Sequence, residues 1–198
     1  MTRLDQQLAF ILEIDKLKEV LRQTRLITGE RRENSAEHSW HIALLAILLA
    51  EYANTLVDVL RVVKMLLIHD IVEIDAGDTF AYSAVPKAEQ ALREQLAAQR
   101  IFGLLPPDQE EEFVALWEEF EAGATPEAQF AHALDRFMPF LHNFHGNGGT
   151  WRLFDVSYEQ VLQRMHPVRA GSETLWGVVE SMLSTAVEQG LLAPPRGE

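Results

Sequence analysis

The sequence contains no cysteine in its 198 residues. This absence excludes disulfides, iron–sulfur clusters, thiolate zinc sites and cysteine nucleophiles, so any bound metal must be held by nitrogen and oxygen atoms. No apolar run reaches the roughly 18 residues that a membrane-spanning helix needs. The first five residues, MTRLD, also lack the basic and apolar segments of a secretory signal. We therefore expect a cytoplasmic protein without membrane contact.

Basic residues are scarce relative to acidic ones. Lys and Arg number 17 against 30 Asp and Glu, which gives a formal net charge of -13. A charge of this sign opposes binding to a nucleic-acid backbone, so we expect no duplex nucleic acid as a partner. It also repels a small phosphorylated substrate unless a cation and a few arginines reverse the field locally. If phosphate chemistry is the function of this chain, its charge therefore favours a bound metal.

Apolar residues recur at three- and four-residue spacing along most of the chain, which predicts an all-α fold. The length and the hydrophobic share of 47% are typical of a single domain over residues 1–198. Within it we expect a core over about 17–151, C-terminal helices over 155–190 and a loose tail over 191–198. Helices are predicted over 5–27, 35–52, 55–74, 87–102, 108–121, 126–142 and 175–189, with a charged loop over 28–34.

Two of these predicted helices carry assignments that matter for the site. Ser35 is the expected N-cap of the helix over 35–52. Its inner face is expected to carry an apolar stripe made of Trp40, Ala43, Leu44, Ile47 and Leu48. In the helix over 5–27, the inner face is expected to use Leu8, Ile11, Leu12, Leu17, Val20 and Leu21.

The segment VVKMLLIHDIVE, residues 62–73, is apolar nearly all round and is therefore expected to be buried. His69 and Asp70 interrupt it. A buried carboxylate is costly unless it is paired, and a metal ion would satisfy both side chains at once. Glu73 follows on the same side of the helix. The alternative is a His-Asp pair that is hydrogen-bonded within the core without any metal.

Two further helices bring isolated polar groups into apolar surroundings. His38 lies in the opening turn of the helix over 35–52, and Asp135 lies within the apolar sequence of the helix over 126–142. Together with His69 and Asp70 they form a set of two imidazoles and two carboxylates. Such a set suits one divalent ion such as Mn, Co, Ni or Fe, or Zn with expanded coordination, and Mg is also left open. Positions would remain for water and a phosphoryl oxygen.

The order His, His-Asp, Asp on successive helices resembles the HD-domain metal-dependent phosphohydrolases, and most closely their 5'-deoxynucleotidase-like members. The resemblance covers about residues 17–151 and is strongest at ENSAEHS (33–39) and at HDIVE (69–73) followed by GDT (77–79). It implies an all-α bundle of about seven to nine helices. It also implies that His38, His69, Asp70 and Asp135 bind the metal and that Glu73 is needed for hydrolysis.

The same resemblance implies the residues that contact the substrate. Asp78 would lie beside the substrate sugar, with Thr79 next to it, and Arg22 in the first helix would contact the phosphate. The chain departs from the deoxynucleotidases at two places: it has Gln23 where they have tryptophan, and TFAY over residues 79–82 where they have a Pro-Thr-containing loop. The likeness therefore favours phosphomonoester hydrolysis more strongly than it favours deoxynucleotides. A (deoxy)nucleoside 5'-monophosphate or a similar small ester is the expected substrate.

Two other functions stay open from the sequence. Glu73 and Asp75 are similar to the acidic pair of alarmone-type pyrophosphohydrolases, which release pyrophosphate rather than orthophosphate. A regulatory module that binds a nucleotide or a metal without turnover would keep the same ligands. Apolar residues in excess of the needs of the core favour a homodimer. The sequence does not decide whether the segment 79–85 closes over the substrate.

Overall fold

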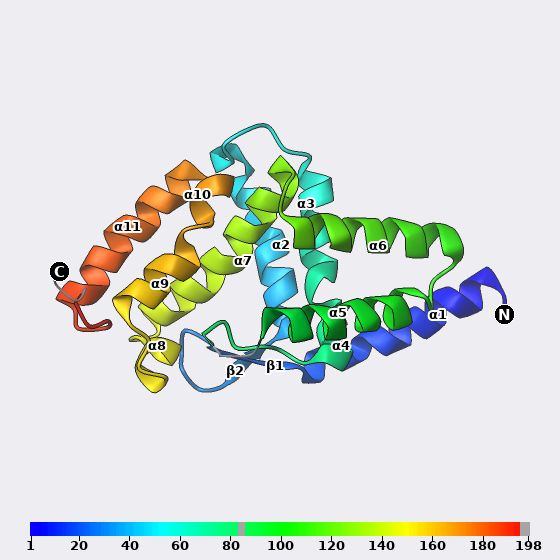
Figure 1. The fold of residues 1–198 in the computed structure, drawn as a ribbon, viewed down its shortest axis with the longest axis horizontal. Helices are drawn as coiled ribbons and strands as arrows, with labels where there is room; N and C mark the ends of the chain where they lie inside the picture. Colours follow the sequence, from blue (N-terminus) through cyan, green and yellow to red (C-terminus); the bar gives the residue numbers. More distant parts are fainter. Residues whose placement is uncertain (83–85, 195–198) are drawn as a thin grey trace.

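The computed structural model describes residues 1–82 and 86–194. Its main elements are helices, which confirms the predicted all-α class. The described residues also contain a short two-stranded ribbon (Figure 1). The sequence leaves open whether the segment 79–85 closes over the substrate, and part of this segment, residues 83–85, lies outside the described residues. No helix in the described part of the chain is long and apolar enough to cross a membrane.

The element bounds are as follows. The amino-terminal half contains α1 (Arg3–Ile14), η1 (Asp15–Glu19), β1 (Leu21–Arg25), β2 (Arg32–Asn34), α2 (Ser35–Leu49), η2 (Ala50–Tyr52), α3 (Val59–Ile68), η3 (His69–Val72) and α4 (Glu73–Ala76). The remainder contains α5 (Lys87–Phe102), α6 (Pro107–Ala122), α7 (Pro126–His145), α8 (Gly149–Leu153), α9 (Tyr158–Met165), α10 (Val168–Gly171) and α11 (Glu173–Glu188).

Helices α2, α3 and α7 form the centre of the molecule, with α1, α5 and α6 toward one end and α8 to α11 toward the other (Figure 1). Ile42 on α2, Met65 and Leu66 on α3, and Leu134 on α7 are fully buried. Burial of such side chains is the main favourable contribution to folding. The four predicted metal ligands project from α2, from α7 or from η3, which directly continues α3, so the core itself holds them in place.

The predicted helix over 5–27 is wrong beyond Ile14. The chain continues through a 3-10 turn into β1, which pairs antiparallel with β2, with Leu21 opposite Asn34. The Arg32 guanidinium donates to the carbonyl oxygens of Leu21 and Arg22. This pairing uses residues about ten positions further on, and such tertiary contacts override helical periodicity. The expected loop over 28–34 accordingly contains β2.

The cap and the inner face of α2 also differ from prediction. The N-cap is Asn34 rather than Ser35: its side chain accepts from the Glu37 amide at 2.9 Å, and the Glu37 carboxylate accepts from the Asn34 amide at 3.2 Å. Ser35 is instead the first helical residue. The helix buries a different face from the one expected, which leaves most of the predicted stripe exposed, namely Trp40, Leu44, Ile47 and Leu48. Leu8, Ile11 and Leu12 of α1 are exposed as well.

The predicted helix over 55–74 is shorter and is divided. It begins at Val59, where the Asp58 side chain accepts from the Arg61 amide at 3.1 Å. At His69 the backbone tightens into a 3-10 turn before α4 begins. Gly77 ends α4 with φ +74°, a left-handed conformation that glycine adopts without steric cost. The tail also starts later than expected, because Leu191 and Leu192 are buried.

Candidate metal centre and its cavity

The structure brings the four predicted metal ligands together. His38 Nε2 lies 3.0 Å from Asp135 Oδ1, and His69 Nε2 lies 2.9 Å from Asp70 Oδ1 and 3.7 Å from Asp135 Oδ1. One nitrogen from each imidazole and one Asp135 oxygen lie within 4.8 Å of one another. Side chains from α2, η3 and α7, namely His38, His69 and Asp135, therefore share a volume of the size that one coordinated ion occupies. Asp70 adjoins this volume through its contact with His69.

The orientation of His69 fits a metal ligand. Its Nδ1–H donates to the Leu66 carbonyl at 2.9 Å, so the lone pair on Nε2 faces Asp70 and Asp135. That Nε2 atom is buried and has no hydrogen-bond partner among the described residues. A buried polar atom without a partner is costly, and a divalent cation would satisfy it. The geometry and chemistry of these side chains therefore fit a bound cation.

The electrostatics of the cluster favour ionised carboxylates. Burial acts to raise the pKa of Asp135, but the adjacent imidazoles of His38 and His69 hold that pKa well below its ordinary value. Burial likewise opposes ionisation of Asp70, whose pKa is lowered by the charges of His69 and Arg22. Deprotonated carboxylates are the form that binds a metal.

A cavity of about 340 Å³ opens beside this cluster. Its wall includes His69, Asp70 and Asp135, and also all four of the residues predicted for catalysis or substrate contact, namely Arg22, Glu73, Asp78 and Thr79. His38 is fully buried behind the wall. Arg22, Arg136 and Arg164 line the same cavity, together with the acidic residues Asp70, Glu73, Asp78, Glu94, Glu121 and Asp135.

Arg22 lies on β1 and not in the first helix, where the resemblance placed it. Its Nη1 donates to Asp70 Oδ2 at 2.5 Å. Burial acts against its charge, but Asp70, Glu73 and Asp135 raise its pKa. Arg22 is therefore a permanent cation next to the predicted metal ligands, and its position depends on the β1–β2 ribbon.

Glu73 and Asp78 are two acids of the cavity wall with altered titration. Burial, followed by the charge of Asp70, raises the pKa of Glu73 well above its ordinary value, while Ser35 Oγ donates to Glu73 Oε2 at 2.6 Å. Burial also raises the pKa of Asp78. Asp75 does not line the cavity and instead accepts from Arg100 at 2.8 Å. The acidic pair that suggested a pyrophosphohydrolase is therefore not formed at this cavity.

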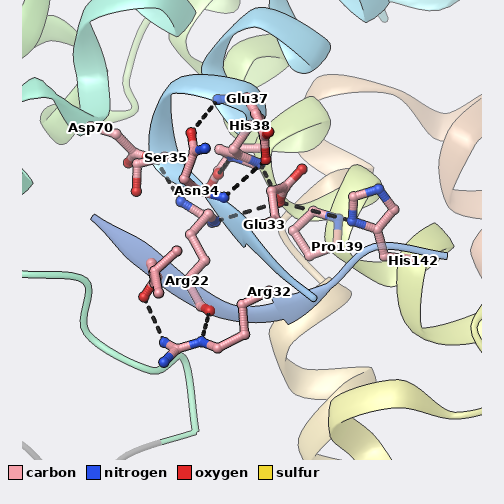
Figure 2. A network of polar contacts seen from close by, with 12 residues as sticks. Arg22, Arg32, Glu33, Asn34, Ser35, Glu37, His38, Asp70, Pro139 and His142 are labelled. Carbon is pink, nitrogen blue, oxygen red and sulfur yellow. Dashed lines mark hydrogen bonds and ion pairs between the residues drawn. The ribbon is translucent and has the colours of Figure 1, made fainter. Parts of the chain in front are cut away.

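Sequence reasoning missed three polar residues behind the cavity. Glu33, Ser35 and His142 are all buried. Figure 2 shows Glu33 between Arg22, His38 and His142. Glu33 and Ser35 belong to the ENSAEHS stretch. The available signal in the sequence was therefore an acidic residue in a mainly polar segment close to His38. His142 was not predictable as a neighbour of Glu33, because the contact joins β2 to α7.

The HD-domain family model matches residues 14–176, which is most of the chain. The chain belongs to the HD-domain family. The resemblance stated from the sequence is thereby confirmed. A crystal structure of a predicted metal-dependent phosphohydrolase from Magnetospirillum magnetotacticum MS-1 superposes on this HD domain with a TM-score of 0.93 at 53% identity, covering 97% of this chain and 96% of that one.

Two curated relatives of this HD-domain chain are 5'-deoxynucleotidases. The one from Danio rerio, HDDC2, is 30% identical over 79% of this chain and 80% of its own length. The one from Homo sapiens, also HDDC2, is 32% identical over 65% of this chain. That alignment spans 62% of the human protein, so a substantial part of the human protein lies outside the matched region.

Proposed function

We propose that this HD-domain chain is a divalent-metal-dependent phosphohydrolase that releases orthophosphate from a (deoxy)nucleoside 5'-monophosphate or a similar small phosphate ester. The observation that carries the proposal is the convergence of His38, His69 and Asp135 on one volume, with Asp70 in contact with His69, beside a cavity lined by Arg22. The names of the relatives from Danio rerio and Homo sapiens support the nucleotide part of the proposal.

Each residue has a chemical task in this proposal. A divalent cation held by the four ligands would polarise the phosphoryl group and make water more acidic. Arg22 offsets the negative charge of the phosphate. Glu73 accepts a proton from the attacking water as the water oxygen bonds to phosphorus. The P–O ester bond breaks, and the proton then passes from Glu73 through water to the leaving oxygen, which gives the alcohol. Asp78 and Thr79 lie at the cavity wall, where they would contact the sugar.

Phosphate release tests the proposal directly. The chain, stripped of metal, is supplied separately with Mn, Co, Ni, Fe, Zn or Mg, and is assayed with deoxy- and ribonucleoside 5'-monophosphates. We expect orthophosphate with at least one ion and none with Asp70→Ala. Pyrophosphate release from a guanosine polyphosphate would favour the alarmone alternative. Tight nucleotide binding without any product would favour the regulatory module, and either result would contradict the proposal.

The metal count of one, the cytoplasmic location and a homodimer are further parts of this proposal. Exposed apolar side chains on α2 support the homodimer: Trp40 is 63% exposed, Ile47 59% and Leu48 62%. Apolar surface of this kind is stabilised when a second subunit covers it. Light scattering should give twice the mass of one chain, and Ile47→Glu should lower it. A monomeric wild type would contradict this part.

A further inference from the structure

Glu33 is a buried acid that the proposed reaction does not use. Its side chain projects from β2 and the residue is 1% exposed. Its Oε2 atom lies 3.5 Å from His38 Nδ1, 3.8 Å from Arg22 Nε and 3.9 Å from His142 Nδ1 (Figure 2). Within the described part of the chain, none of these four atoms has a hydrogen-bond partner. One carboxylate oxygen therefore faces three nitrogen atoms that are otherwise unsatisfied.

This arrangement constrains the tautomer of His38. A neutral imidazole carries a proton on one ring nitrogen and a lone pair on the other. A carboxylate opposite Nδ1 favours the proton there, which leaves the lone pair on Nε2, the atom that lies 3.0 Å from Asp135 Oδ1. At His69 the Leu66 carbonyl takes the same place. Both imidazoles thus point their Nε2 lone pairs into the same volume. A carboxylate faces Nδ1 of His38, whereas a backbone carbonyl accepts from Nδ1 of His69.

Glu33 also contacts the other half of the site. Arg22 has Nη1 on Asp70 and Nε toward Glu33, so two carboxylates hold the two sides of one guanidinium group. Without Glu33, Arg22 would keep its hydrogen bond to Asp70, but its Nε atom would no longer face a carboxylate. The orientation of the group proposed to bind phosphate depends on that restraint.

We infer that Glu33 is a positioning residue, which fixes His38 for the cation and Arg22 for the phosphate through a single carboxylate oxygen. This inference rests on the proposed function for the role of the cation and of the phosphate. The buried position of Glu33 is explained by it, because an ionised carboxylate is retained in a core only where donors surround it.

Binding of Mn²⁺ to the metal-stripped protein tests the inference without any turnover. Glu33→Gln preserves size and an acceptor but removes the charge. We expect Mn²⁺ to bind it about 10- to 100-fold more weakly by calorimetry, the range typical of lost outer-shell partners of a metal site. Glu37→Gln is the matched control, because Glu37 lies in the same stretch but pairs with exposed Arg31. We expect the control to bind Mn²⁺ as the wild type does.

Two measurements separate positioning from a general loss of structure. Thermal unfolding of the metal-free variant establishes that it is folded, and Glu33→Asp, which withdraws the carboxylate, should give an intermediate loss of affinity if the Gln variant does not fold. With a nucleoside monophosphate, Glu33→Gln should also raise KM, because Arg22 is less restrained. Wild-type Mn²⁺ affinity in a folded Glu33→Gln protein would overturn the inference.

A different result would assign Glu33 another role. Glu33, His41 and His142 also offer ligand atoms that lie within 4.8 Å of one another. If the wild type binds two Mn²⁺ ions and Glu33→Gln loses only one, with unchanged affinity for the other, Glu33 holds a second cation and the inference fails. If the wild type binds Mn²⁺ but hydrolyses no ester, the proposed function fails while the effect of Glu33 on affinity still stands. No binding at all would overturn both.

Discussion

The proposed metal ligands and the arginine proposed to face the phosphate are held by two different kinds of structure. His38, His69 and Asp135 extend from packed helices or their direct continuations, among fully buried side chains. Arg22 extends from β1, a strand in a ribbon of only two, whose partner β2 is three residues long. Two-stranded ribbons have little stability of their own. The difference indicates that the proposed cation site is fixed by the core, whereas the proposed phosphate site depends on a few polar contacts.

Loss of Glu73 should have the largest effect on turnover while leaving the cation site intact. Glu73→Gln removes the proposed proton acceptor, and general-base catalysis typically contributes about 10²- to 10⁴-fold. We expect kcat to fall by about that factor. Mn²⁺ affinity, measured in parallel, should remain close to that of the wild type, because Glu73 is not among the four ligands. Full activity of Glu73→Gln would remove this residue from the mechanism.

Loss of Arg22 should affect the substrate more than the metal. A charge-assisted hydrogen bond contributes roughly 1.5–3 kcal/mol, so Arg22→Gln should raise KM by about 10- to 100-fold. Arg25→Gln on the same strand is the control, since among the residues that the structure describes the Arg25 side chain donates to the Gly29 carbonyl in an exposed turn and to no other acceptor. Steady-state kinetics of both variants provide the measurement. Equal KM values for the two variants would contradict the assignment of the phosphate to Arg22.

Ser35→Ala should give a smaller effect that depends on pH. The folded protein raises the pKa of Glu73, chiefly by burial, and the hydrogen bond from Ser35 acts in the opposite direction. A base must be ionised to act, so kcat/KM falls as the pH decreases through this raised pKa. Removal of the Ser35 donor should raise the pKa of Glu73 further, and the acidic limb of the pH profile should therefore move to higher pH.

The matched substitution for this test is Ser39→Ala, a buried serine one turn further along α2. At neutral pH we expect kcat/KM of Ser35→Ala to fall by about tenfold, the equivalent of one typical hydrogen bond. The Ser39→Ala profile should keep its acidic limb in place. An unshifted limb in Ser35→Ala would show that Glu73 does not set the pH dependence.

The same contrast explains which parts of the site could be predicted from the sequence. His69, Asp70 and Asp135 interrupt apolar helical sequence, and a polar residue in a core is visible in the sequence by itself. Arg22 was expected in a helix because Leu17, Val20 and Leu21 fit a helical spacing. The residues that turn this segment into a strand lie about ten positions later, and a local pattern cannot contain such pairing.

The exposed face of α2 illustrates a second physical reason. Trp40, Leu44 and Ile47 share a helical face, and so do the buried residues His38 and Ile42. The helix is apolar on most of its circumference, so periodicity alone does not select the inner face. The position of the His38 ligand selects it instead. The inner face of such a helix is predicted better from the polar residue that must face the site than from the spacing of its apolar residues.

The smallest expected effect lies at the junction of the ribbon and α2. Arg31 Nη2 lies 2.7 Å from Glu37 Oε1, and the two side chains are 54% and 37% exposed. Exposed ion pairs contribute roughly 0–1 kcal/mol, because water screens them and both side chains lose freedom. Arg31→Gln should therefore lower the free energy of unfolding by less than about 1 kcal/mol in urea titrations and leave KM unchanged. A KM as high as that of Arg22→Gln would mean that the hairpin, and not the Arg22 contacts with Asp70 and Glu33, fixes the phosphate site.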